Sequence, residues 1–450
     1  DMFNRRVTLN SSDPLLIVAF DPLTKFNGFF SAVIGHKGDP EKLTMGPYTY
    51  YHEYSQVPNP DEEFGHSIKP MKAAHAKVWV VTRETAEAAP NYFLTKDFKS
   101  FSPLSNSQPQ EHYNWLKAEL VTWKLPGGSP SQGVLYKPEN FNPKNKYPLI
   151  FYIYRGLSHL VYGFPDPGFA EARINVPWFV SRGYLVFMPD VHFTISSETG
   201  EVNGESVVNA VESAAKYLTG FSWVDANKLG VQGHSFGGFE ASYLATHSKI
   251  FAAVAEASGG TDAVSGYLTL CGFTEETSKQ QGAEIGYPGA YGASLWERPD
   301  LYLKNSSVLH ADQVSAPLLI MHNKLDNQIQ WRQGVEFYMA LRRLGKRVWM
   351  LQYDNEAHGV LHKDDQVDYT YRLTQFFDHY LKDSACPKWM LYGIPAKMKG
   401  VDYGFELVRE KDQHGKWMTP QYKPSLTDAE WRKEEAAKAE RADIEKVTGK

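Results

Sequence analysis

Apolar and polar positions follow two different patterns along the chain. Residues 1 to about 110 contain short runs of β-branched and aromatic residues separated by Pro, Gly, Asn and Asp. From there to about residue 381, apolar runs of strand length alternate with segments whose apolar residues recur at helical spacing. The first pattern predicts an all-β region, and the second predicts an α/β domain with a mostly parallel, helix-covered sheet.

The individual elements follow from these runs. In the first region we expect strands at 15–19, 29–34, 77–82 and 91–95. In the second we expect strands at 131–138, 147–154, 184–188, 229–232, 252–256, 317–321 and 347–352, and helices at 170–182, 204–218, 239–246, 330–344 and 367–381. The predicted domains are 1–110, 111–397 (with 111–130 as the crossover) and a charged C-terminal extension over 398–450.

Length and composition narrow the picture only slightly. The chain has 450 residues, which is enough for two domains. Its net charge of −5 does not indicate a basic surface that would bind nucleic acid. Cys271 and Cys386 permit one disulfide but exclude a disulfide scaffold. The longest apolar runs are of strand length, so no membrane span is expected. Because the chain starts at Asp1 without an initiator Met, we expect a piece of a longer precursor.

The segment 229–246 carries the strongest chemical signal. An apolar strand leads into Gly233-His234-Ser235-Phe236-Gly237, which fits G-x-S-x-G, and a helical pattern follows. Strand, tight turn and helix form the context of a nucleophile elbow, in which the serine hydroxyl stands clear of the sheet. The N–H of Phe236 would then point at the place where a tetrahedral oxyanion forms.

A serine nucleophile needs a base and an acid that orients the base. Asp326 follows the strand at 317–321 and His358 follows the strand at 347–352, so their order along the chain is Ser, Asp, His. The carboxyl ends of parallel strands meet at one edge of a sheet, which favours a triad of Ser235, Asp326 and His358.

Three neighbouring residues compete for these roles. His234 is the rival base, but it is adjacent to Ser235 on a sharp turn and should point away from the hydroxyl. Asp354 and Glu356 are rival acids, which their closeness to His358 makes better suited to shaping the loop. His322 is expected to be a packing or loop residue.

A second oxyanion donor is expected after the strand at 147–154, where Tyr154 could offer its hydroxyl. The alternative is a Tyr that merely closes the end of an apolar strand. Arg155 and Arg332 would lie near the rim of such a site and could bind an acidic side chain or a peptide carboxylate.

With these motifs the chain resembles the prolyl oligopeptidase (S9) family of serine peptidases. The resemblance is carried by Gly233–Gly238, by His322 to Ile329, and by Glu356-Ala357-His358-Gly359. It implies an α/β-hydrolase domain preceded by the last blades of a β-propeller, with residues 1–110 as those blades. It also implies the oxyanion role of Tyr154, and a location in the periplasm or cell envelope as in similar bacterial members, with the cytoplasm as the alternative.

Two departures from the family affect specificity. Dipeptidyl peptidases of the family line a proline pocket with Tyr and Trp shortly after the elbow, whereas 258–267 here has few aromatics. Such enzymes also bind the substrate amino terminus with paired glutamates, and Glu62-Glu63 sits in a Pro/Asp-rich loop outside that context. Post-proline cleavage is therefore in doubt, and an acidic P1 preference stays open.

The sequence predicts a serine peptidase that acts on short peptides through an acyl-enzyme, with no metal and no organic cofactor. An esterase on the same scaffold and a catalytically silent binding subunit are the alternatives. Expected partners are a peptide substrate and the missing propeller segment of the same precursor; a homo-oligomer stays open.

Overall fold

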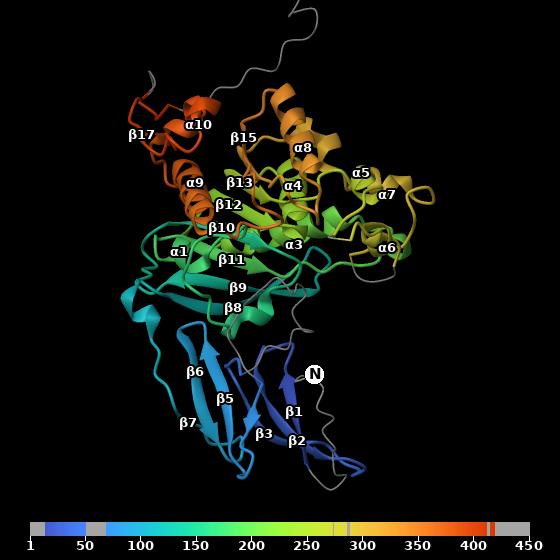
Figure 1. Ribbon diagram of the computed structural model, residues 1–450, viewed down its shortest axis with the longest axis vertical. Helices are drawn as coiled ribbons and strands as arrows, with labels where there is room; N and C mark the ends of the chain where they lie inside the picture. Colours follow the sequence, from blue (N-terminus) through green and yellow to red (C-terminus); the bar gives the residue numbers. More distant parts are fainter. Residues whose placement is uncertain (1–13, 51–68, 273, 286–288, 412–414, 419–450) are drawn as a thin grey trace, which may run out of the picture.

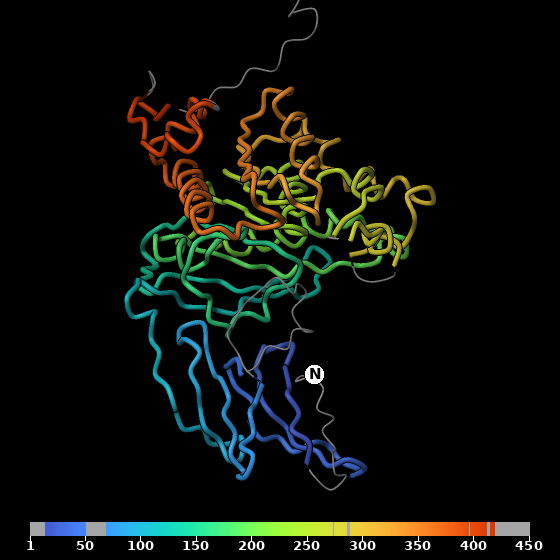
Figure 2. Tube along the Cα trace, in the orientation of Figure 1, coloured from blue at the N-terminus to red at the C-terminus, as the bar shows by residue number. Residues whose placement is uncertain are grey.

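The computed structural model describes residues 14–50, 69–272, 274–285, 289–411 and 415–418. Figures 1 and 2 show a large helix-covered sheet with two smaller sheets beside its β8–β9 edge. The strands change sheet between β7 (Ser102–Pro103) and β8 (Leu116–Lys124), which brackets the predicted domain boundary at residue 110.

The two smaller sheets are antiparallel and lie in the first 103 residues. One has three strands and the other has four, which fits two successive blades as the sequence predicts. Their strands are β1 (Pro14–Phe20), β2 (Asn27–Val33), β3 (Glu41–Gly46), β4 (Met71–Lys72), β5 (Trp79–Thr85), β6 (Ala88–Thr95) and β7.

The large sheet has eight strands in the order β15-β14-β13-β12-β10-β11-β9-β8. From β11 to β15 every neighbouring pair is parallel, whereas β8 and β9 join antiparallel at one edge. Besides β8, its strands are β9 (Pro130–Pro138), β10 (Tyr147–Ile153), β11 (Leu185–Pro189), β12 (Val224–His234), β13 (Ala253–Ala257), β14 (Leu318–Met321) and β15 (Val348–Leu351).

Helices cover both faces of this sheet, and the strands are apolar on both sides. Alternate residues of β10 enter two separate cores: Ile150 and Tyr152 pack in the core that includes α1 (Val176–Val180) and α9 (Lys363–Leu381). Leu149 and Phe151 pack in the core of α3 (Asn203–Leu218), α4 (Phe236–His247) and α8 (Trp331–Arg343). This double burial explains why β10 reads as an unbroken apolar run.

The remaining helices are short and lie in connections. They are η1 (Pro109–His112), η2 (Ser158–Tyr162), α2 (Ser196–Thr199), α5 (Ala263–Tyr267), α6 (Ser278–Glu284), α7 (Pro299–Lys304), η3 (Ser307–Gln313), α10 (Lys388–Tyr392) and η4 (Ala396–Met398). Within the described ranges, no helix combines the length and the apolarity needed to cross a membrane.

One sequence-based assignment was wrong. The helix expected at 170–182 is reduced to α1, because Asn175 caps the N–H of Trp178 and Pro177 occupies the first turn. The preceding N–H groups of Ala170 and Ile174 instead donate to Thr370 and Gln232. The structure also places β8, a nine-residue edge strand that the sequence did not predict, within the segment 111–130 that we expect to be the crossover.

The C-terminal extension begins by packing back onto the large domain. β17 (Leu407–Val408) pairs with β16 (Cys386–Pro387), and Gln375 of α9 donates to the carbonyl of Phe405 at 2.7 Å. The charged segment 431–446 lies outside the described residues.

Candidate active site

The turn between β12 and α4 has a strained backbone at Ser235. This residue has φ 58° and ψ −116°, a combination that side-chain-bearing residues rarely adopt. The glycines of the motif allow the close packing around it. A Cβ at Gly233 would lie 2.0 Å from the carbonyl oxygen of Gly237, and one at Gly237 would lie 2.1 Å from that of Ile153. The sequence motif therefore has a steric basis in this turn.

The structure brings Ser235, His358 and Asp326 into one hydrogen-bonded chain. The Ser235 Oγ lies 2.8 Å from the His358 Nε2, and the His358 Nδ1 lies 2.8 Å from the Asp326 Oδ2. Asp326 follows β14 and His358 follows β15, so neighbouring parallel strands deliver acid and base to the same edge. With the Nδ1 proton on the carboxylate side, the Nε2 is left to accept the serine proton.

Three N–H donors and a second imidazole hold Asp326 as a buried anion. Its Oδ1 accepts the backbone N–H groups of Gln328 and Ile329 at 2.9 and 3.0 Å. Its Oδ2 also lies 3.4 Å from the Nε2 of the fully buried His322. Burial alone would raise the pKa of Asp326, but the hydrogen bonds from His322 and His358 outweigh it and hold that pKa well below its usual range. Asp326 therefore stays ionised.

The rival base and the rival acids have other partners. The His234 Nε2 lies 2.7 Å from the carbonyl oxygen of His358, and burial lowers the pKa of this imidazole to about 3. Asp354 forms an ion pair with Lys399 at 2.5 Å. Glu356 is buried and binds the backbone of its own loop. Among the described residues, neither His234 nor Asp354 nor Glu356 forms a hydrogen bond with the Ser235 hydroxyl.

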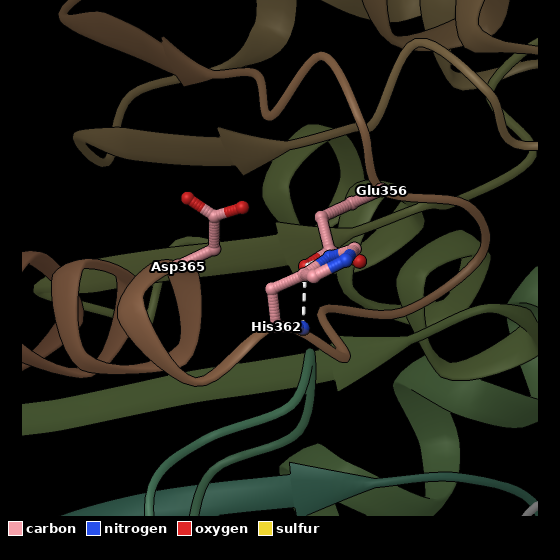
Figure 3. Close-up of side chains that lie close together, drawn as sticks. All are labelled: Glu356, His362 and Asp365. Atoms are coloured by element: carbon pink, nitrogen blue, oxygen red, sulfur yellow. Dashed lines mark hydrogen bonds and ion pairs between the residues drawn. The ribbon is translucent and has the colours of Figure 1, made fainter. Parts of the chain in front are cut away.

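Glu356, His362 and Asp365 form the one described cluster whose three potential ligand atoms lie within 4.8 Å of one another (Figure 3). The oxygens of Glu356 already accept the N–H groups of Leu361 and His362 and face the His362 Nδ1 at 2.9 Å. This arrangement explains the cluster as the anchor of the loop between His358 and α9. We assign no metal to it.

Sequence reasoning missed Asn323, which links the loops that carry acid and base. Its fully buried side chain donates to the carbonyl of Gly359 at 3.1 Å and accepts the N–H of Tyr353 at 3.3 Å. Asn323 thus joins the end of β14 to both sides of His358. The only signal in the sequence is its position three residues before Asp326.

A cavity of about 390 Å³ opens beside Ser235. Tyr154, Arg155 and Phe236 line it, as predicted for residues next to the reacting group. The guanidinium carbon of Arg155 lies 4.1 Å from the centre of the Phe236 ring. Arg332, in contrast, lies on the exposed side of α8 and is not among the described residues that line the cavity.

The aromatic lining of this cavity comes from separate segments. Tyr267 closes α5, whereas Tyr291 and Tyr302 come from the later connection and from α7. The Tyr302 ring centre lies 5.1 Å from that of Tyr267 and 4.6 Å from that of Tyr291. The scarcity of aromatics over 258–267 therefore does not make the pocket poor in them. Glu62-Glu63, the other specificity candidate, lies outside the described residues.

Comparisons with known proteins agree with this geometry. A dipeptidyl-peptidase 5 of Porphyromonas endodontalis is 28% identical over 264 residues, which are 55% of this chain and 35% of that protein. A probable chloroplastic glutamyl endopeptidase of Arabidopsis thaliana is 22% identical over 59% of this chain and 27% of its own length. The crystal structure of a putative dipeptidyl aminopeptidase IV from Bacteroides ovatus matches with a TM-score of 0.60 and 19% identity, covering 82% of this chain and 48% of that one.

The chain spans about a third of the length of the curated relatives it matches. Residues 170–384 match the sequence model of the prolyl oligopeptidase family, and this range holds Ser235, Asp326 and His358. The chain therefore carries a peptidase domain of the prolyl oligopeptidase family.

Proposed function

We propose that the protein is a serine peptidase that cleaves peptide bonds through an acyl-enzyme on Ser235. The observation that carries this proposal is the continuous path from the Ser235 Oγ through His358 to the buried Asp326 carboxylate. His358 takes the serine proton as the hydroxyl attacks the substrate carbonyl, and then gives that proton to the leaving amine. Water deacylates the enzyme by the same route.

Two groups are placed to stabilise the tetrahedral oxyanion. The Phe236 N–H belongs to the first turn of α4, where N–H groups have no partner within the helix. Tyr154 follows β10 directly and lines the cavity together with Ser235. We assign the backbone N–H of Phe236 and the Tyr154 hydroxyl as the two donors.

Arg155 makes a carboxylate the favoured substrate group in the cavity. It lines the space beside Ser235 together with Lys279 and Asp262. Two of these three side chains are cationic, and the Asp262 carboxylate accepts the N–H groups of Val264 and Ser265. A peptide with an acidic P1 side chain fits this lining, and the probable glutamyl endopeptidase among the relatives supports that substrate class. The proposed substrate site does not include Arg332, which is not among the described residues that line the cavity.

Labelling with a fluorophosphonate probe, read out by intact mass, tests the proposal. We expect one adduct on the native protein and none on Ser235→Ala. Digestion of a peptide library then reports the P1 preference, with Arg155→Met expected to remove any preference for Glu or Asp. Labelling without peptide cleavage would favour an esterase, and a folded protein that does not label would favour a binding subunit.

The location in the periplasm or cell envelope and the separate propeller partner remain predictions from the sequence.

A further inference from the structure

Glu240 is a fully buried acid close to the proposed oxyanion site, and the mechanism above does not use it. It lies on α4, five residues after Ser235, and its side chain has no exposed surface. Its Oε1 accepts the backbone N–H of Arg155 at 3.1 Å. Its Oε2 has no hydrogen-bond partner among the described residues. A buried carboxyl with an unused oxygen is costly, which calls for an explanation of its presence here.

The hydrogen bond from Arg155 fixes the corner that carries Tyr154. Arg155 has φ 48°, a left-handed conformation that is unfavourable for a residue with a side chain. Its N–H belongs to the peptide bond that follows Tyr154, so the Glu240 carboxyl holds that peptide against the nucleophile helix. The Arg155 guanidinium packs on Phe236 of the same helix. Two side chains of α4 thus set the position of Tyr154 relative to Ser235.

The protonation state of Glu240 decides whether a neutral acid or a buried anion holds the Tyr154–Arg155 corner. Burial raises the pKa of Glu240 to about 8. The hydrogen bond from Arg155 and its positive charge act in the opposite direction but are outweighed. Arg155 is the one charged group among the described residues that acts on this carboxyl; β10, β12, β13, α3 and η3, which pack on α4, contribute no other. Above about pH 8 a buried anion appears at the corner that carries Tyr154, close to where negative charge develops during the reaction.

We propose that Glu240 is a positioning residue that, as a neutral acid, holds the Tyr154–Arg155 corner beside Ser235, and that its ionisation disables the oxyanion site. This inference rests on the proposed peptidase function. It predicts that activity falls in alkali because Glu240 ionises. The triad is not expected to cause such a fall, because a general base such as His358 works in its unprotonated form, which alkali favours.

The test is the second-order rate of fluorophosphonate labelling between pH 6.5 and 9 for the native protein and for Glu240→Gln. The native rate should fall above about pH 8, approaching tenfold per pH unit. Glu240→Gln keeps an oxygen for the Arg155 N–H and cannot ionise. It should label within about threefold of the native rate at pH 7 and show no alkaline fall.

Glu84→Gln is the matched control. Glu84 is likewise buried and likewise accepts a backbone N–H, that of Phe164 at 3.2 Å, but it lies on β5 outside the cavity beside Ser235. This variant should keep the native alkaline fall. Glu240→Met fills a similar volume without a titrating group, so it should lack the fall and should lower kcat about tenfold with KM unchanged. Glu240→Met also serves if Glu240→Gln does not fold.

Three outcomes would overturn the proposal. A native labelling rate that stays level from pH 7 to 9 removes the ionisation effect. An alkaline fall that persists in Glu240→Gln or Glu240→Met assigns it to another group. No labelling at any pH overturns the peptidase proposal together with this one, and is readily told apart from a level but measurable rate.

Discussion

Asp326 remains an anion in a site where burial alone would raise its pKa. Two backbone N–H groups and two imidazoles surround its carboxylate, so each of its oxygens has polar partners. The same contacts orient His358, because the Nδ1–H can be satisfied only by this carboxylate. The negative charge of the triad and the orientation of His358 thus both depend on the Asp326 side chain.

Asp326→Asn should lower kcat by roughly 10³–10⁴-fold with little change in KM. An amide can hold the ring in the wrong tautomer and cannot stabilise the imidazolium that forms during attack. Steady-state kinetics on a peptide substrate would measure the loss. Asp354→Asn, a change in the neighbouring loop at a residue paired with Lys399, should leave kcat near the native value. Equal losses in the two variants would contradict the assignment of the acid.

Tyr154→Phe should lower kcat by about 10²-fold and leave KM nearly unchanged, because an oxyanion donor acts mainly in the transition state. Tyr152→Phe is the matched control two residues earlier, on β10: that ring is buried in the core and is not among the described residues that line the cavity. If Tyr154→Phe kept full kcat, the second donor would have to be a different group.

At the scale of elements, residue order and strand character were enough to predict most of what lies around the site. The buried strands β10 to β15 and the helices α3, α4, α8 and α9 appear near their expected positions, because each shows a long, regular pattern. The loops that follow β12, β14 and β15 meet because parallel strands end at one edge.

What the sequence could not reveal depends on tertiary partners. The segment before α1 resembles a helix in its local pattern, yet its N–H groups bind Thr370 and Gln232, which are distant in sequence. Asn323 and Glu240 likewise look ordinary until the fold supplies Gly359 and Arg155 as their partners. Arg332, also expected near the rim, lies on the exposed side of α8 and is not among the described residues that line the cavity.

Asn323→Ala tests the link between the loops of β14 and β15. It removes a donor to the Gly359 carbonyl and an acceptor for the Tyr353 N–H, both beside His358. We expect a loss of about 1–3 kcal/mol in the free energy of unfolding, measured in urea, and about tenfold in kcat. Asn355→Ala is the control: Asn355 is exposed in the loop after β15, and its replacement should change neither the free energy of unfolding nor kcat. A native kcat in a destabilised Asn323→Ala would show that the link serves stability alone.

At the scale of the whole molecule, an aromatic contact joins the four-stranded sheet to the large one. The Trp115 ring stacks on Phe164 at 4.9 Å, and its indole N–H donates to the carbonyl of Ala86, at the turn between β5 and β6. Phe164 in turn donates its backbone N–H to Glu84 of β5. One apolar core therefore runs from the four-stranded sheet into the face of the large sheet covered by α1 and α9.

The buried titratable groups make the free energy of unfolding of the whole molecule depend on pH. Burial raises the pKa of Glu240 to about 8 and that of Glu256 to about 7, whereas both carboxyls titrate near 4.5 when unfolded. A carboxyl with a raised folded pKa holds its proton in the native state after the unfolded chain has lost it. Such a group makes stability fall as pH rises, until the folded pKa is passed. His234, whose pKa is lowered to about 3, instead reduces stability as pH falls below 6.5.

Between pH 6.5 and 8 the falling contributions dominate, since the unfolded chain protonates His234 only at the lower end of this window. His322 acts in the same direction as the two acids: burial lowers its pKa, but the Asp326 carboxylate beside its ring outweighs burial and raises it. At about 1.4 kcal/mol per proton and pH unit, the free energy of unfolding should drop by about 2 kcal/mol over this window. Urea denaturation at pH 6.5 and 8 measures the drop. In Glu240→Gln/Glu256→Gln most of it should vanish, because the amides do not titrate. A stability that rises across the window, or an equal drop in the double variant, would contradict the assignment of these two acids as neutral in the folded protein.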